Sequence, residues 1–123
     1  MRPSQDRIGV LQQLFDEFNE DEFDGKLTQI RLLIKRNCHR DGYYEFKSQT
    51  RNGDKWMPCR EQLHKATITI SDGCWEEDSV RGTLLHEMMH QYQCEVLDEA
   101  PHHTKFFNDW AKKLERKYKF TVR

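Results

Sequence analysis

The sequence predicts an α+β fold with an N-terminal helix, a sheet of three or four strands, a central helix and a C-terminal helix. Apolar residues recur every three or four positions near both ends of the chain and again over residues 80–92, a spacing typical of amphipathic helices. Short runs rich in branched and aromatic residues lie between these segments, next to turn signals, as β-strands do. The 123 residues suffice for one modest core, so we expect a single domain over residues 1–123.

The first predicted helix covers most of residues 4–23. Its apolar positions at helical spacing are Ile8, Leu11, Leu14, Phe15 and Phe18. Ser4 is the candidate N-cap, because a serine side chain can accept a hydrogen bond from the first turn. Asp24-Gly25 is a helix stop signal, so we expect the helix to end there.

Three strands are predicted in the middle of the chain. Residues 30–35 are rich in branched apolar side chains, and residues 43–47 alternate after the turn signal Asp41-Gly42. Residues 48–65 contain turn residues and are predicted to be irregular. Residues 66–71 are the clearest strand. It is either a site where substrate adds as a further strand or an ordinary sheet edge.

The central helix is predicted to begin between Glu76 and Ser79, with Asp78 or Ser79 as its cap. Gly82 lowers its helix propensity, and either a close backbone contact or simple tolerance explains that glycine. Apolar residues occur on more than one side of this helix, which indicates burial beneath the sheet. They are Val80, Leu84, Leu85, Met88, Met89 and Tyr92.

The last helix is predicted from about Thr104 to Lys119, with Phe107, Trp110 and Leu114 in its apolar stripe. Because only 36% of the residues are apolar, aromatic side chains must form much of the core. The aromatic residues expected there are Phe15, Phe18, Phe23, Trp56, Trp75, Phe106, Phe107 and Trp110.

The central helix contains the motif His86-Glu87-Met88-Met89-His90, an H-E-x-x-H pattern. Histidines at positions i and i+4 project from one helical face, so both imidazoles can reach one metal ion. Glu87 then lies beside that ion and can take a proton from a water molecule that the metal activates. Two histidines leave Zn²⁺ underligated, so we expect a third protein ligand.

The candidates for the third ligand are His102 and His103, which follow Pro101. His103 has Phe107 four residues later, and His102 has Phe106 at the same spacing. Both positions come just before the last helix, which can hold either histidine against the core.

The four cysteines, Cys38, Cys59, Cys74 and Cys94, form no C-x-x-C pair and are expected to be thiols. A second metal site at Cys38, His39, Cys59 and His64 would fit no standard module. No apolar run approaches the roughly 20 residues needed to span a membrane, and residues 1–7 lack the apolar stretch of a secretory signal. We therefore expect an intracellular protein, in the cytoplasm or nucleoid, or in the nucleus of a eukaryote.

The net charge of −1 conceals alternating blocks: residues 1–25 and 66–104 are acidic, and residues 26–65 and 105–123 are basic. The 26–65 block also contains Tyr43, Tyr44 and Trp56. Aromatic rings among cations can stack on unpaired bases, which suggests single-stranded or damaged DNA as a partner. The alternative is solvated charge that balances the acidic blocks.

Several segments resemble the SprT-like metalloprotease family, which includes bacterial SprT and the eukaryotic Spartan protease. Residues 15–27 are similar to the family's opening helix and its turn into the sheet, and residues 68–71 to the strand before the active-site helix. Residues 83–90 are very close to its central motif. Residues 103–107 resemble its H-G-x-x-F segment, although Thr104 replaces the usual glycine.

The resemblance implies a zincin-like fold and a zinc-dependent endopeptidase. His86, His90 and His103 would bind Zn²⁺, and Glu87 would be the general base. We favour His103 over His102 because the last helix's apolar stripe is then in register. DNA-associated or DNA-crosslinked proteins are the substrates that the resemblance implies. The alternative is a zinc-containing, nucleic-acid-associated binding or regulatory module without turnover, and we expect no C-terminal zinc ribbon or accessory module.

Overall fold

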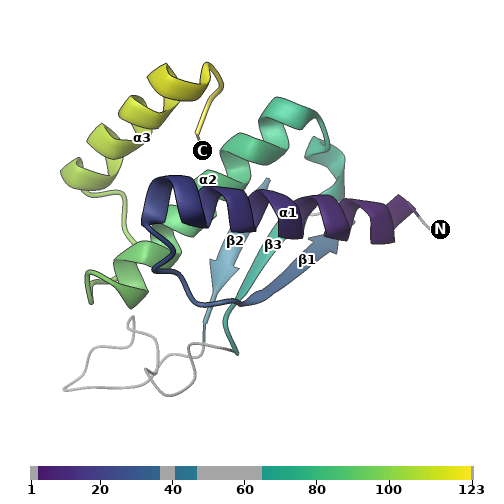
Figure 1. Ribbon diagram of the computed structural model, residues 1–123, viewed down its shortest axis with the longest axis horizontal. Helices are drawn as coiled ribbons and strands as arrows, with labels where there is room; N and C mark the ends of the chain where they lie inside the picture. The colour runs from purple at the N-terminus through teal and green to yellow at the C-terminus, as the bar shows by residue number, and fades with distance from the viewer. Residues whose placement is uncertain (1–2, 37–40, 47–64, 123) are drawn as a thin grey trace.

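The computed structural model describes residues 3–36, 41–46 and 65–122, which form the expected α+β arrangement (Figure 1). Within these ranges there are three α-helices and one three-stranded sheet. The elements in chain order are α1 (Pro3–Phe23), β1 (Arg31–Lys35), β2 (Gly42–Glu45), β3 (Thr67–Ser71), the short 3₁₀-helix η2 (Asp72–Cys74), α2 (Glu77–Glu95) and α3 (Lys105–Tyr118). Most of the predicted irregular segment 48–65 lies outside the described residues.

The sheet has the order β1-β3-β2, with β1 parallel and β2 antiparallel to β3. Ile68 pairs with Leu32 on one side and with Tyr44 on the other. The prediction that residues 66–71 offer a sheet edge is therefore wrong. Four consecutive residues of β3, from Ile68 to Ser71, are buried, and the strand is paired on both sides.

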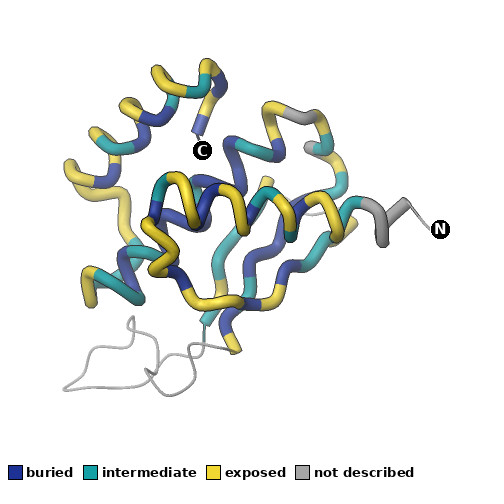
Figure 2. The backbone as a smooth tube through the Cα atoms, in the orientation of Figure 1, coloured by how far each residue is buried: buried dark blue, intermediate teal, exposed yellow. Residues whose placement is uncertain are grey.

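The helices α1 and α2 cover one face of the sheet. α1 packs against β1, α2 packs against β2 and β3, and the two helices also contact each other. α3 lies beside α2 and away from the strands (Figure 1). In Figure 2, buried and exposed positions alternate along each helix, as amphipathic spacing requires. One apolar cluster joins all three helices and the sheet, with Phe15, Ile68, Met88 and Phe107 among its members.

α1 begins at Pro3, so the prediction of Ser4 as its N-cap is wrong. Proline is well tolerated in a first helical turn because its missing N–H has no helical partner there. The predicted stop is confirmed. Asp24 and Gly25 have left-handed φ values of 54° and 70°, and the Gly25 N–H donates to the Asn19 carbonyl at 2.7 Å.

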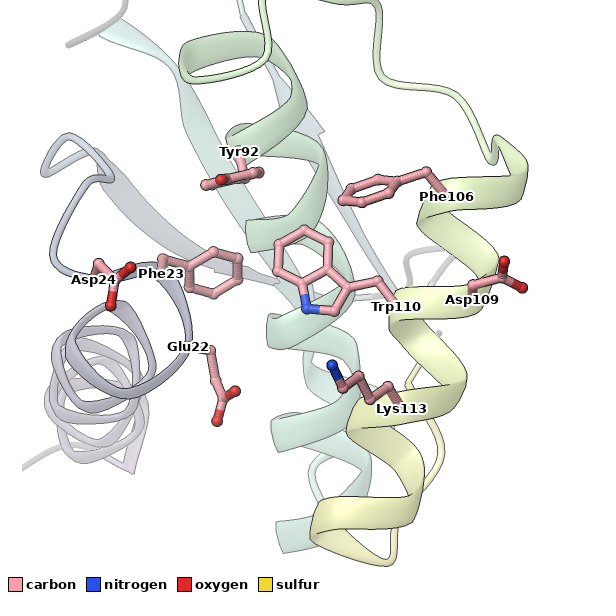
Figure 3. Close-up of a pocket in the computed structure, with 8 residues that line it drawn as sticks. All are labelled: Glu22, Phe23, Asp24, Tyr92, Phe106, Asp109, Trp110 and Lys113. Atoms are coloured by element: carbon pink, nitrogen blue, oxygen red, sulfur yellow. The ribbon is translucent and has the colours of Figure 1, made fainter.

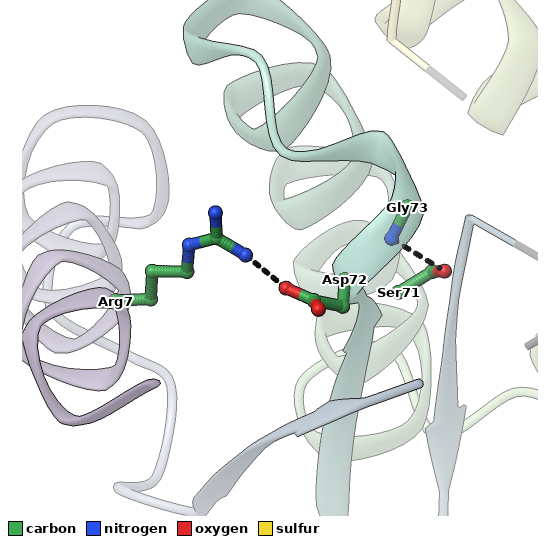
Figure 4. Close-up of polar contacts among 4 residues, drawn as sticks. All are labelled: Arg7, Ser71, Asp72 and Gly73. Carbon is green, nitrogen blue, oxygen red and sulfur yellow. Dashed lines mark hydrogen bonds and ion pairs between the residues drawn. The ribbon is translucent and has the colours of Figure 1, made fainter. Parts of the chain in front are cut away.

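A polar cluster holds the start of α1 against the entrance to α2 (Figure 4). Arg7 forms an ion pair with Asp72, and its guanidinium lies 5.0 Å from the Trp75 ring centre. The Ser71 hydroxyl accepts a hydrogen bond from the Gly73 N–H at 3.3 Å. The chain thus turns within a few residues from β3 into α2.

The start of α2 differs from the predicted cap. Glu76 is the extended N-cap residue and forms no side-chain cap, while Asp78 and Ser79 already lie inside the helix. The predictions of Asp78 or Ser79 as the cap are therefore wrong, because η2 ends two residues earlier and the chain enters the helix sooner. The predicted burial of α2 is confirmed: Leu84 and Met89 are both fully buried.

β2 begins at Gly42, one residue before the predicted strand. A side chain at Gly42 would bring its Cβ within 2.7 Å of Thr83 Cγ2 and 2.9 Å of the Thr69 carbonyl oxygen. The absence of a side chain therefore lets β2 lie directly against α2. This close approach forms one wall of the cavity described below.

The last helix agrees with its prediction to within one residue at each end. Thr104 is its N-cap, with its hydroxyl accepting from the Phe107 N–H at 3.2 Å, and Lys119 is the left-handed C-cap. Phe15, Phe18, Phe23 and Phe107 are buried as predicted, and Trp75 and Trp110 are half-buried. Phe106 is 57% exposed, so its assignment to the core is wrong, and Trp56 lies outside the described residues.

Cys94 is buried and forms no disulfide. The hypothetical second site at Cys38, His39, Cys59 and His64 lies entirely outside the described residues. None of the helices in the described part of the chain has the length and apolar character needed to cross a membrane.

Candidate metal centre

α2 places His86 and His90 one helical turn apart, facing the same cavity. Their Nε2 atoms are 3.2 Å apart. The helix is held in place by its fully buried apolar residues, so both rings project from a rigid element.

His103 supplies the third nitrogen from the segment before α3. Its Nε2 lies 3.2 Å from that of His90 and 3.1 Å from that of His86, so the three atoms form a nearly equilateral triangle. Two nitrogens bound to one tetrahedral zinc at about 2.0–2.1 Å are about 3.3–3.4 Å apart. The three imidazoles therefore fit a single metal ion of this kind, and the structure brings all three predicted ligands together.

His102, the alternative third ligand, is exposed and lies outside this cluster. Its carbonyl oxygen accepts a hydrogen bond from Gln93 Nε2 at 2.7 Å. The residue four positions after each histidine explains the difference, because Phe107 is buried and Phe106 is exposed. The start of α3 therefore directs His103 to the other two imidazoles, although it is itself exposed to solvent, and leaves His102 outside the cluster.

Gln93 orients the second histidine. Its Oε1 lies 2.8 Å from His90 Nδ1, and its Nε2 donates to Glu99 and to the His102 carbonyl. The amide oxygen can only accept, so the proton of His90 is on Nδ1 and the lone pair is on Nε2. Gln93 thus selects the tautomer needed for a metal ligand and also holds the loop that leads to His103.

Phe107 packs against all three imidazoles. Its ring centre lies 4.5 Å from that of His90 and 5.0 Å from that of His103 in stacked arrangements, and 5.1 Å from that of His86 edge-on. Because Phe107 is buried at the start of α3, it limits the rotation of each ring. The Phe107 ring is the apolar surface on which the three imidazoles pack.

The C-terminal segment after α3, which contains Thr121 and Val122, lies beside His86. Gly82, one turn before His86, is so close to this segment that a Cβ would lie 1.7 Å from the Thr121 carbonyl oxygen. The open question about this glycine is resolved in favour of a close backbone contact. His86 Nδ1 is buried without an ordinary hydrogen bond in the described structure, and the nearby Val122 backbone acts to raise its pKa.

Burial, together with repulsion from the charged forms of His90 and His103, lowers the pKa of His86 from 6.5 to about 4. Burial also lowers the pKa of His90 to about 4, although the hydrogen bond that His90 donates to Gln93 opposes this shift. Both imidazoles are therefore neutral near pH 7, as a metal ligand must be.

The three nitrogens face a cavity of about 480 Å³. β2 and the preceding Asp41 form one wall, Pro101 forms another, and Glu87 of α2 lines the cavity beside His86. Glu87 is only 6% exposed. The predicted base and the three predicted ligands thus share one cavity that is open to solvent and bordered by the edge strand of the sheet.

Sequence reasoning did not identify Gln93, Phe107 or Val122 as parts of the site. Gln93 had a usable signal, because a residue three positions after His90 lies on the same helical face. Phe107 was recognised as part of the apolar stripe and of the segment that resembles the family's H-G-x-x-F pattern, but its contact with all three imidazoles was not foreseen. Val122 had no local signal, because its contact with the site depends on the path of the chain after α3.

The fold and the site define an α+β protein with a three-histidine centre able to hold a metal ion. The model of the SprT-like family matches residues 11–123, so the chain belongs to that family. A search of curated proteins finds no match to the chain.

Proposed function

We propose that this protein is a zinc-dependent endopeptidase. The observation that supports the proposal is the triangle of three Nε2 atoms, 3.1–3.2 Å apart, in the cavity that Glu87 also lines. Three histidines from the protein leave a tetrahedral ion with one position for water or substrate, as in catalytic zinc sites. Membership of the SprT-like family agrees with this assignment.

His86, His90 and His103 would hold the ion, which when bound polarises a carbonyl and lowers the pKa of water. Glu87 acts as the general base and takes the proton from the attacking water. It then delivers that proton to the leaving amine. Its place immediately after His86 on a rigid helix supports this role, because proton transfer requires a fixed position within hydrogen-bond reach.

The edge of β2 offers a place for an extended peptide. The Ser71 N–H donates to the Asp41 carbonyl at 2.7 Å, so Asp41 directs its backbone toward β3. Backbone direction alternates along an antiparallel strand, so Gly42 and Tyr44 direct theirs away from β3. A substrate strand paired there would lie next to the three histidines, because both residues line the same cavity.

Replacement of Glu87 by glutamine tests the proposal. Glu87→Gln should retain one zinc per chain, measured by elemental analysis, and should reduce casein cleavage by about 10²-fold or more. Glu76→Gln, at the exposed N-cap of the same helix, is the matched control and should cleave normally. Full activity of Glu87→Gln would overturn the role of Glu87, and cleavage that persists with a chelator would overturn the role of the metal.

The alternative is a zinc-containing binding or regulatory module without turnover. Structural zinc sites usually have four protein ligands. In the described part of the chain, the cluster consists of three histidines, and no cysteine, aspartate or glutamate joins it. Three protein ligands rather than four favour a catalytic site over a structural one. Action on DNA-crosslinked proteins is a further proposal that rests on family membership.

A further inference from the structure

A second cavity, of about 400 Å³, lies where α1, α2 and α3 meet. Its walls include four aromatic side chains, and Figure 3 shows Trp110 between Phe23 of α1 and Phe106 of α3, with Tyr92 of α2 beside it. The ring centre of Trp110 is 5.3 Å from that of Phe23, 5.2 Å from that of Tyr92 and 5.9 Å from that of Phe106. This volume suits one long side chain or a small ligand, since such pockets measure about 300–1,000 Å³.

Phe106 is the most exposed large apolar side chain in the described part of the chain, and it lies in the wall of this cavity. Its neighbour Phe107 packs on the three histidines, so α3 separates the two cavities. The second cavity is therefore distinct from the metal centre, although both involve the first turn of α3.

Negative charge surrounds the aromatic rings. Glu22, Asp24 and Asp109 line the cavity, and Lys113 is the one basic residue among the described residues that line it. Glu22 is already paired with Lys117 at 2.6 Å, but the carboxylates of Asp24 and Asp109 form no ion pair with any described residue. In Figure 3 these two carboxylates lie on opposite sides of the aromatic group.

Two helix ends add to this negative potential. α1 ends at Phe23, and Tyr92 lies in the last turn of α2. The C-terminal end of a helix carries partial negative charge, which basic residues usually offset, but neither helix has a basic residue in its last turn. Lys113 and the first turn of α3 have the opposite sign, so the balance still favours a cation.

We propose that this aromatic cavity binds an arginine side chain from a basic segment of a partner protein. A guanidinium is planar and weakly hydrated, so it stacks on aromatic rings while its N–H groups pair with carboxylates. Trp110 and Phe106 offer the rings, and Asp24 and Asp109, on opposite sides of these rings, add the negative charge that attracts a cation. The site is independent of the proposed peptidase activity, because none of its residues contributes to the metal centre.

The test uses the full ¹⁵N-labelled chain and follows the indole N–H signal of Trp110 by NMR. The probes are acetyl-Gly-Arg-Gly-amide and the same peptide with citrulline, which has the shape of arginine without its charge. We expect a saturable shift with the arginine peptide, with a dissociation constant of about 1–10 mM, and at least about fivefold weaker binding of the citrulline peptide. Equal binding of the two peptides, or no saturable shift with either, would overturn the proposal.

Variants at exposed positions locate the site and determine the sign of its charge. Phe106→Ala and Asp109→Asn should each weaken arginine binding severalfold, while Val10→Ala, a change at another exposed apolar residue, should have no effect. Lys113→Gln should tighten binding about two- to fivefold, because it removes the opposing charge. Weaker arginine binding in Lys113→Gln would contradict the proposal, because removal of a nearby positive charge must favour a bound cation.

Discussion

At the scale of single residues, two buried glutamines on α2 differ in what they hold. Gln91 and Gln93 are both fully buried, and each donates to a backbone carbonyl of a connecting segment. Gln91 Nε2 donates to the Thr28 carbonyl at 2.8 Å, in the segment between α1 and β1. Gln93 binds the His102 carbonyl and also His90 Nδ1. Gln91 thus has a packing role, whereas Gln93 also orients His90, a candidate metal ligand.

This difference makes Gln91→Ala a matched control for Gln93→Ala. Both variants should lower the free energy of unfolding of the metal-free protein by about 1–3 kcal/mol, because each leaves buried partners unsatisfied. Only Gln93→Ala should weaken zinc binding, by about 10–100-fold, because His90 loses the group that fixes its tautomer. Chelator competition measures the affinity. Equal zinc affinities in the two variants would show that Gln93 is merely structural.

The histidines should make the metal-free protein sensitive to acid. In the unfolded chain they gain a proton near pH 6.5, but burial delays this in the folded chain until about pH 4 for His86 and His90. Between these values the unfolded state binds more protons, so the free energy of unfolding falls as the pH falls. From pH 7 to pH 5 we expect a loss of about 2 kcal/mol, allowing for partial solvent exposure.

Urea unfolding in the presence of a chelator, at pH 7 and pH 5, measures this loss. The double variant His86→Gln/His90→Gln should lose much less stability over the same interval, because glutamine does not titrate. If wild type and double variant change equally, other groups are responsible for the acid sensitivity.

The sequence predicts the parts of the site that lie on one helix, and the physical reason is the fixed geometry of a helix. His86, Glu87 and His90 follow from spacing alone. The choice of His103 required the apolar register of the last helix, because His102 and His103 both lie just before that helix and neither is excluded by its position in the sequence. Which atom of His90 bears the proton depends on the amide orientation of Gln93, and that is decided by the loop containing His102.

At the scale of elements, the close contact between α2 and the C-terminal segment gives a sharp prediction. Gly82→Ala places a Cβ 1.7 Å from the Thr121 carbonyl oxygen, so the backbone of the segment must move. We expect a loss of about 2–3 kcal/mol in stability. Zinc binding should also weaken, because the segment buries the back of His86.

Gly9→Ala is the control, because Gly9 also lies within a helix and a Cβ there would meet nothing within 4 Å. It should raise stability by about 0.5–1 kcal/mol, since alanine has the higher helix propensity. Thermal unfolding measures both variants. A stabilising effect of Gly82→Ala would contradict the observed contact.

Helix boundaries and strand positions were predictable, whereas strand order was not. Local patterns located each strand to within about two residues, but pairing depends on contacts between distant segments. In the structure Thr69 is buried as fully as Ile68 and Ile70, which fits a central strand. In the sequence this stretch alternates between polar and apolar residues, as a strand with one face in solvent also does.

At the scale of the whole molecule, the alternating charge blocks lie in different helices and strands. The basic block 105–123 forms α3 and its C-terminal segment, where Lys117 pairs with Glu22 of the acidic N-terminal helix. The described cations of block 26–65 include Lys35 and Arg36, which are exposed at the end of β1. Tyr44, one of the aromatics suggested to stack on bases, packs against the core. Binding of nucleic acid by block 26–65 stays a prediction.

Charge reversal tests that prediction. Lys35→Glu/Arg36→Glu should weaken binding to fluorescent single-stranded DNA by about tenfold or more at low salt. The slope of log affinity against log salt should become shallower by about 1.4, or 0.7 per lost phosphate contact. Lys112→Glu/Lys119→Glu changes the net charge equally within the other basic block, so it separates a local binding surface from a general effect of charge. Equal weakening by both pairs would exclude a site specific to block 26–65, and wild-type binding that is absent even at low salt would exclude the nucleic-acid partner altogether.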